Sequence, residues 1–72
     1  SKYTPKWWGW RYLIFQIYLD YGVSFKDPKA LKNLIAMYER FKSLGVLENC
    51  PQKNEMFNLY QKAKTELQSL GG

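Results

Sequence analysis

The chain has 72 residues and is basic, with 11 Lys and Arg against 6 Asp and Glu and a formal net charge of +5. This length suits one small domain, so we expect residues 1–72 to form a single helical domain, complete or cut from a longer protein. The sequence has no His and only one cysteine, Cys50, which excludes the commonest general base, an internal disulfide and a cysteine-based metal cluster. We therefore expect no enzymatic activity, no cofactor, no metal site and no small-molecule substrate.

The first predicted helix covers residues 5–21. Thr4 supplies an N-cap oxygen, Pro5 suits the first helical position, and Gly22 is placed to end the helix. The segment 11–21 is also rich in aromatic and β-branched residues, which suits a strand. We prefer a helix because of the capping pattern and because no partner strand is predicted elsewhere.

Two further helices are predicted over residues 28–44 and 51–70. The second begins at Asp27-Pro28 and ends before Gly45, with apolar residues repeating every three or four positions. The third begins at Asn49-Cys50-Pro51 or at Asn54. All connections are short, so the predicted fold is all-α: a small three-helix bundle with antiparallel neighbours and an aromatic-rich first helix. The expected core contains Leu31, Leu34, Tyr38, Phe41, Tyr60, Ala63 and Leu67.

The first helix carries more apolar surface than two neighbouring helices can cover. Its apolar residues occupy roughly 260° of a helical wheel, whereas an ordinary core stripe occupies about 100°. Only Pro5, Gly9, Gln16 and Asp20 form a polar strip. Either part of the apolar surface is exposed to a partner, which we favour, or the flanking residues 1–4 and 22–27, with Tyr3 and Phe25, fold over it.

Arg11 lies inside the apolar arc, one turn after Trp7 and Trp8 and one turn before Phe15. Its guanidinium can stack on an indole or pair with a carboxylate. Alternatively, the side chain snorkels from the edge of the bundle while its stem covers a ring, and this is the arrangement that we expect.

Protein docking is the function that we predict from this composition. Trp, Tyr and Arg are the residues that most often dominate protein interfaces. We expect the first helix to bind a protein partner or a second copy of the chain, with Lys2 and Lys6 steering the approach. The predicted partner-binding residues are Lys6, Trp7, Trp8, Trp10, Arg11 and Tyr12.

Two alternatives use the positive charge of the chain. Nucleic acid binding would use a basic face of the second helix formed by Lys29, Lys32, Asn33 and Arg40, although Glu39 interrupts it. Adsorption to an anionic membrane surface would use residues 6–21 lying flat, although aromatic residues surround too much of this helix for a typical in-plane anchor. A single cysteine and the lack of a signal peptide favour an intracellular location.

Overall fold

The computed structural model describes residues 2–71 and contains α1 (Pro5–Ser24), α2 (Pro28–Leu44), the short 3-10 helix η1 (Val46–Asn49) and α3 (Lys53–Ser69). No strand occurs within these residues. The predicted all-α three-helix bundle is confirmed, and the alternative of a strand over residues 11–21 is wrong.

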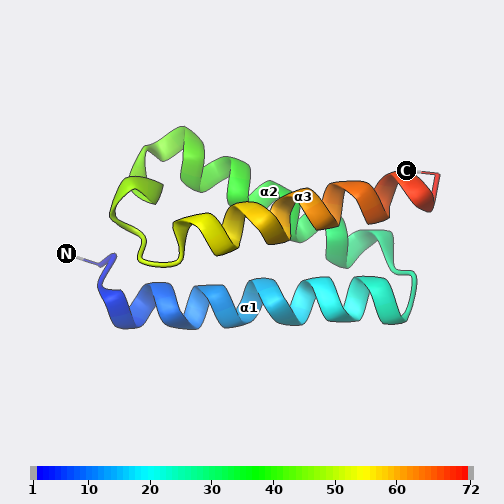
Figure 1. Ribbon diagram of the computed structural model, residues 1–72, viewed down its shortest axis with the longest axis horizontal. Helices are drawn as coiled ribbons and strands as arrows, with labels where there is room; N and C mark the ends of the chain where they lie inside the picture. The colour runs from blue at the N-terminus through cyan, green and yellow to red at the C-terminus, as the bar shows by residue number, and fades with distance from the viewer. Residues whose placement is uncertain (1, 72) are drawn as a thin grey trace.

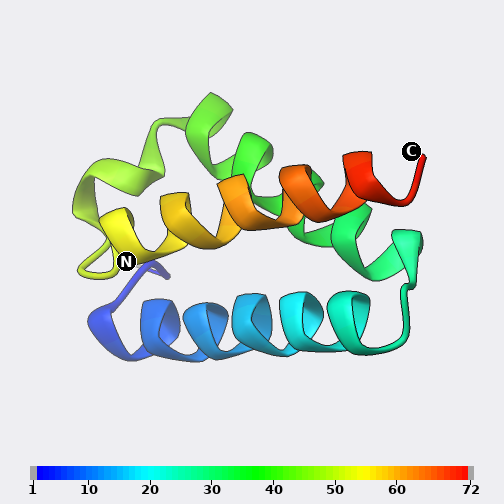
Figure 2. The same ribbon diagram turned by 45° about the vertical axis from the view of Figure 1, so that its right-hand side comes forward.

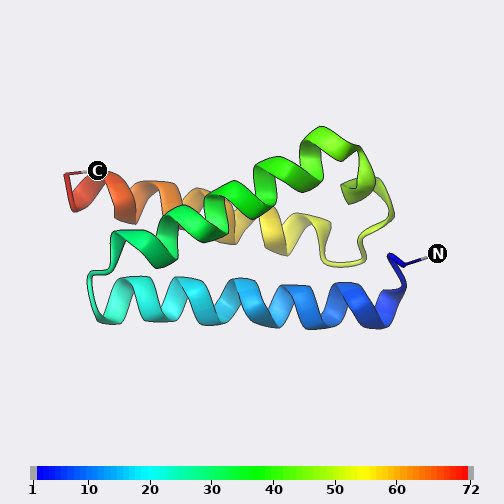
Figure 3. The ribbon, with the colours of Figure 1, turned by 180° about the vertical axis from the view of Figure 1, so that it is seen from behind.

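Each of the three long helices contacts the other two. In Figure 1, α1 runs along one edge, while α2 and α3 lie together on one side of it, and Figure 2 shows the same arrangement from another side. The helix α2 runs opposite to α1 and α3, as the view from behind in Figure 3 also shows. The predicted antiparallel packing of neighbours in the sequence is therefore present, and one long side of α1 lies away from both other helices.

The predicted caps of the first two helices are present. The Trp7 amide donates a hydrogen bond to Thr4 Oγ1 (3.1 Å), and the Lys29 amide donates one to Asp27 Oδ1 (2.9 Å). Gly45 follows α2 in the left-handed region, with a φ of 73°. The start of α3 differs from both predicted positions, because η1 intervenes and the helix begins at Lys53 with no side-chain cap.

The prediction that Gly22 ends the first helix is wrong. Gly22 is buried inside α1, which continues to Ser24. The helix ends in a Schellman motif, in which the Asp27 amide donates to the Gly22 carbonyl and the Lys26 amide to the Val23 carbonyl. Lys26 takes the left-handed conformation with a φ of 50°, so a lysine occupies the position where glycine is favoured.

The core lies between the three helices and is rich in aromatic residues. Its largest fully buried side chains are Trp8, Phe15, Leu31, Leu34 and Met56. Among the residues predicted for the core, Leu31, Leu34, Tyr38, Phe41 and Ala63 are buried, while Tyr60 and Leu67 are half-buried against its edge.

Tyr38 and Tyr60 join α2 to α3. Their rings stack with a centroid distance of 4.3 Å. The Tyr60 hydroxyl donates a hydrogen bond of 2.8 Å to Glu39 Oε2, which holds this carboxylate against α3. Burial and the neighbouring Tyr60 raise the pKa of Tyr38.

Candidate binding surface

The helix α1 presents a different environment on each of its sides. Trp8, Phe15, Leu19 and Gly22 are its buried residues and mark the side that faces the core. The opposite side of the helix, about 180° away, meets neither α2 nor α3. The exposed apolar residues of α1 are concentrated on this opposite side.

We call this surface the outward face of α1. It is formed by Trp10, Leu13, Ile17 and Tyr21, which follow one another at spacings of three or four residues. The side chain of Trp10 is 61% exposed and that of Ile17 is 55% exposed. Phe25, which is 69% exposed, extends the face because its ring lies 4.7 Å from that of Tyr21. Large apolar side chains therefore line the outward face along most of α1.

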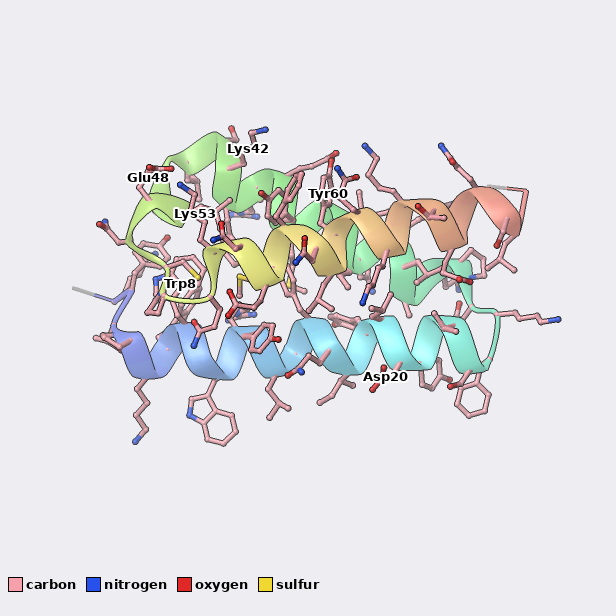
Figure 4. All side chains as sticks on the ribbon, viewed as in Figure 1. Trp8, Asp20, Lys42, Glu48, Lys53 and Tyr60 are labelled. Carbon is pink, nitrogen blue, oxygen red and sulfur yellow. The ribbon has the colours of Figure 1, made fainter. Side chains whose placement is uncertain are left out.

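Trp8 belongs to the core and is not available to a partner. It is 0% exposed, and its ring lies 5.2 Å from Phe41 of α2. The prediction of Trp8 as a partner-binding residue must therefore be corrected. Trp8 lies about 160° around the helix from the exposed Trp10. Its side chain points between the helices, as Figure 4 shows. Its indole Nε1 is buried without a hydrogen-bond partner within residues 2–71.

The predicted residues Trp7, Arg11 and Tyr12 are half-buried on the flanks of α1. Trp7 packs edge-on against Phe41, and Tyr3 packs against Trp7 with a centroid distance of 5.0 Å. Tyr3 thus covers part of the aromatic surface, as the alternative of flanking coverage proposed, whereas Phe25 is exposed and covers little.

The guanidinium of Arg11 stacks on Trp7 instead of reaching into solvent. Its Cζ atom lies 4.6 Å from the ring centroid of Trp7, and Nη1 lies 4.0 Å from the Met37 sulfur on α2. Its Nε is buried without a hydrogen-bond partner in the described part of the chain. The expectation that Arg11 snorkels is therefore wrong, because the charged group itself packs against the indole.

Charged residues occur at both ends of the outward face. Lys6 is exposed one turn before Trp10, and Asp20 is exposed beside Tyr21. Figure 4 shows Asp20 on the side of α1 that points away from α2 and α3. Neither Lys6 nor Asp20 forms an ion pair or a side-chain hydrogen bond with residues 2–71.

The residues predicted for nucleic acid binding lie on α2 and are exposed: Lys29, Lys32, Asn33 and Arg40. Asn33 and Arg40 line a shallow groove between α1 and α2 together with Tyr18. Glu39, which was expected to interrupt this basic face, is bound to Tyr60 at the α2–α3 contact instead.

Within the described residues, no group of three or more His, Cys, Asp or Glu side chains is arranged to hold a metal ion. The helices of residues 2–71 include none with both the length and the hydropathy that crossing a membrane requires. Cys50 is buried, with its Sγ atom 3.7 Å from the Met56 sulfur, and burial raises the pKa of its thiol.

Leu13, Ile17, Tyr21 and Phe25 are surface residues that were not predicted from the sequence. Their spacing after Trp10 is visible in the sequence, but apolar residues surround most of this helix, so spacing alone does not identify the exposed side. The expected polar strip does not mark the exposed side either, because two of its residues, Gly9 and Gln16, are half-buried.

No protein-family model matches the chain, and neither a curated protein nor a solved structure matches it.

Proposed function

We propose that this chain is a non-catalytic protein-docking module that binds its partner through the outward face of α1. The observation that carries the proposal is the run of exposed Trp10, Leu13, Ile17 and Tyr21, with Phe25 beyond it, on the one side of α1 that no other helix covers. Contiguous apolar patches of a few hundred Å² on small proteins commonly mark interaction sites.

The residue types on this face support docking to a protein. Tryptophan and tyrosine are enriched among the residues whose truncation weakens protein interfaces most. Trp10 has an exposed ring and supplies the anchor, while Lys6 and Lys2 at the same end of α1 raise the association rate by attracting acidic groups of the partner. The half-buried Trp7 and Arg11 support the helix from its flank and take part at the rim only.

Because Cys50 has no second cysteine with which to pair, we also propose a reducing, intracellular location.

Site-specific photo-crosslinking tests this proposal. A photoreactive phenylalanine analogue replaces Leu13 on the outward face or, as a matched control, the exposed Leu44 at the end of α2. In an extract of the cells that produce the chain, we expect a discrete protein adduct from position 13 alone. Excess wild-type chain should suppress it, and excess Trp10→Ala chain should not. Equal adducts from both positions, or equal competition by the two chains, would overturn the proposal.

Nucleic acid binding is the second candidate, and the Glu39–Tyr60 hydrogen bond favours it. This bond turns the Glu39 carboxylate toward α3, which leaves Lys29, Lys32 and Arg40 without an acidic neighbour in their midst. Phosphate contacts by these residues would make binding steeply salt-dependent. Duplex DNA titrations across a salt series test the candidate. The candidate is supported if Lys29→Ala and Lys32→Ala reduce the slope of log affinity against log salt concentration while Trp10→Ala leaves it unchanged. It is rejected if the chain does not bind DNA at low salt.

A further inference from the structure

We propose that the partner of the outward face is a second copy of this chain, bound with the two α1 helices antiparallel and related by a two-fold axis beside Leu13. This inference rests on the proposed function and specifies the partner. It follows from the order of charged and apolar residues along the outward face.

The two charged residues of the outward face lie at equal distances from Leu13. Lys6 precedes Leu13 by seven positions and Asp20 follows it by seven, which places each about 10 Å along the helix from Leu13. In an antiparallel pair centred on Leu13, Lys6 of each copy faces Asp20 of the other, so one two-fold axis forms two ion pairs. The same register places Trp10 within one residue of Ile17 of the second copy.

The charges are available for such contacts. Lys6 and Asp20 are both exposed, and the ion pair of the described residues joins Lys53 to Glu48, far from α1 in sequence. A face with a cation at one end and an anion at the other is complementary to itself when reversed. An anionic lipid surface would instead repel Asp20, so the charge order favours a second copy over a membrane.

The surface is large enough for a weak dimer. The exposed parts of Trp10, Leu13, Ile17 and Tyr21 supply about 400 Å² per copy, since large side chains of this kind have areas of about 200 Å². A standard interface removes about 800 Å² per partner. In the register centred on Leu13, the two copies of α1 overlap over residues 5–21, which is about 25 Å of helix. The available area is about half of the standard value, so we expect a weak dimer that dissociates on dilution.

Sedimentation equilibrium of the purified full chain, from about 10 μM to about 1 mM, tests the inference. The wild type should shift from monomer to dimer as concentration rises. Lys6→Glu and Asp20→Lys should each weaken self-association about ten-fold, because each places like charges together at both ends. Lys6→Glu also lowers the overall positive charge that separates two copies, so general repulsion cannot explain its effect. The control Lys32→Glu makes the same charge change on α2 and should not weaken dimerisation.

Mixing the two charge variants gives the most specific result. A mixed dimer of Lys6→Glu with Asp20→Lys again has opposite charges at both ends, so native mass spectrometry should show it in excess of either homodimer. Circular dichroism of each variant establishes that the helices are intact. A mixture that pairs no better than the single variants, or a dimer that Trp10→Ala leaves unchanged, would overturn the inference.

The outcomes separate this inference from the proposed function. A chain that stays monomeric to about 1 mM, yet still gives the Trp10-dependent adduct with another protein, overturns the dimer and leaves protein docking in place. A monomer that instead adsorbs to phosphatidylserine-containing vesicles through Trp10 overturns both proposals and assigns the outward face to a lipid surface.

Discussion

Gly22 of α1 and Leu31 of α2 lie so close that a Cβ atom at position 22 would be 2.5 Å from Leu31 Cδ2. Leu31 is fully buried and belongs to the hydrophobic core, so its side chain is packed among other core residues. The absence of a side chain at Gly22 therefore allows the last turns of α1 to pack against the start of α2.

Gly22→Ala should destabilise the domain by about 1–3 kcal/mol, because the added methyl group overpacks the contact with Leu31. Gly9→Ala is the matched control within the same helix. A Cβ at Gly9 meets nothing within 4 Å, so this change should stabilise the domain by about 0.5–1 kcal/mol through helix propensity. Urea denaturation measures both, and a Gly22→Ala chain as stable as the wild type would contradict the close contact.

Lys26→Gly should stabilise the domain by about 0.5–1 kcal/mol, because glycine adopts the left-handed conformation at the end of α1 without the steric penalty of a side chain. Thermal unfolding followed by circular dichroism measures the change. Lys32→Gly, in the interior of α2, is the control and should lower stability by about 1 kcal/mol. If both substitutions lowered stability, the left-handed conformation of Lys26 would not be the source of a steric penalty.

The tryptophans should separate stability from binding. Trp8→Ala should destabilise the domain by about 3–5 kcal/mol, since it empties a fully buried site. Trp10→Ala should change stability by about 0.5 kcal/mol or less, since its ring is largely exposed. Chemical denaturation of the two variants checks this contrast, and a large loss for Trp10→Ala would mean that the ring is structural.

Leu34 provides a further measure of the core. Leu34→Ala should lower the free energy of unfolding by about 2–5 kcal/mol, because the side chain is fully buried between the helices. Leu44→Ala removes the same group from an exposed position and should have an effect of about 0.5 kcal/mol. Guanidinium titrations of both variants make the comparison, and an effect below about half a kcal/mol at Leu34 would place it outside the core.

The stability of the domain should fall as pH rises through the alkaline range. Burial raises the pKa of the Cys50 thiol above its ordinary value of 9.0, so the unfolded chain loses this proton at lower pH than the folded chain. The stabilising contribution is complete below pH 9.0 and is lost as pH rises through the folded pKa. Cys50→Ala should flatten the decline in denaturation midpoints as pH rises above 9.0. An unchanged slope would assign the decline to tyrosines such as Tyr38, whose pKa is also raised.

Local features of the sequence were sufficient to predict most of the fold. Thr4 and Asp27 cap helices through atoms within one turn of themselves, and Gly45 adopts its turn geometry without a distant partner. The apolar spacing of residues 28–44 also identified the buried side of α2, since polar residues occupy its other side. The helical class of the domain and much of its core follow from such short-range patterns.

The binding surface was determined by tertiary packing. Trp7, Trp8 and Trp10 are near neighbours in the sequence, yet they are half-buried, fully buried and exposed because α2 and α3 pack on one side of α1. Apolar residues occur around most of α1, so its own sequence does not define which side is buried. Gly22 also depends on tertiary packing. In the sequence alone it predicts the end of the helix, but in the structure it lies inside α1, where Leu31 of α2 packs closely against it. The outward face exists because two neighbouring helices cover only part of a helix that is apolar on nearly every side.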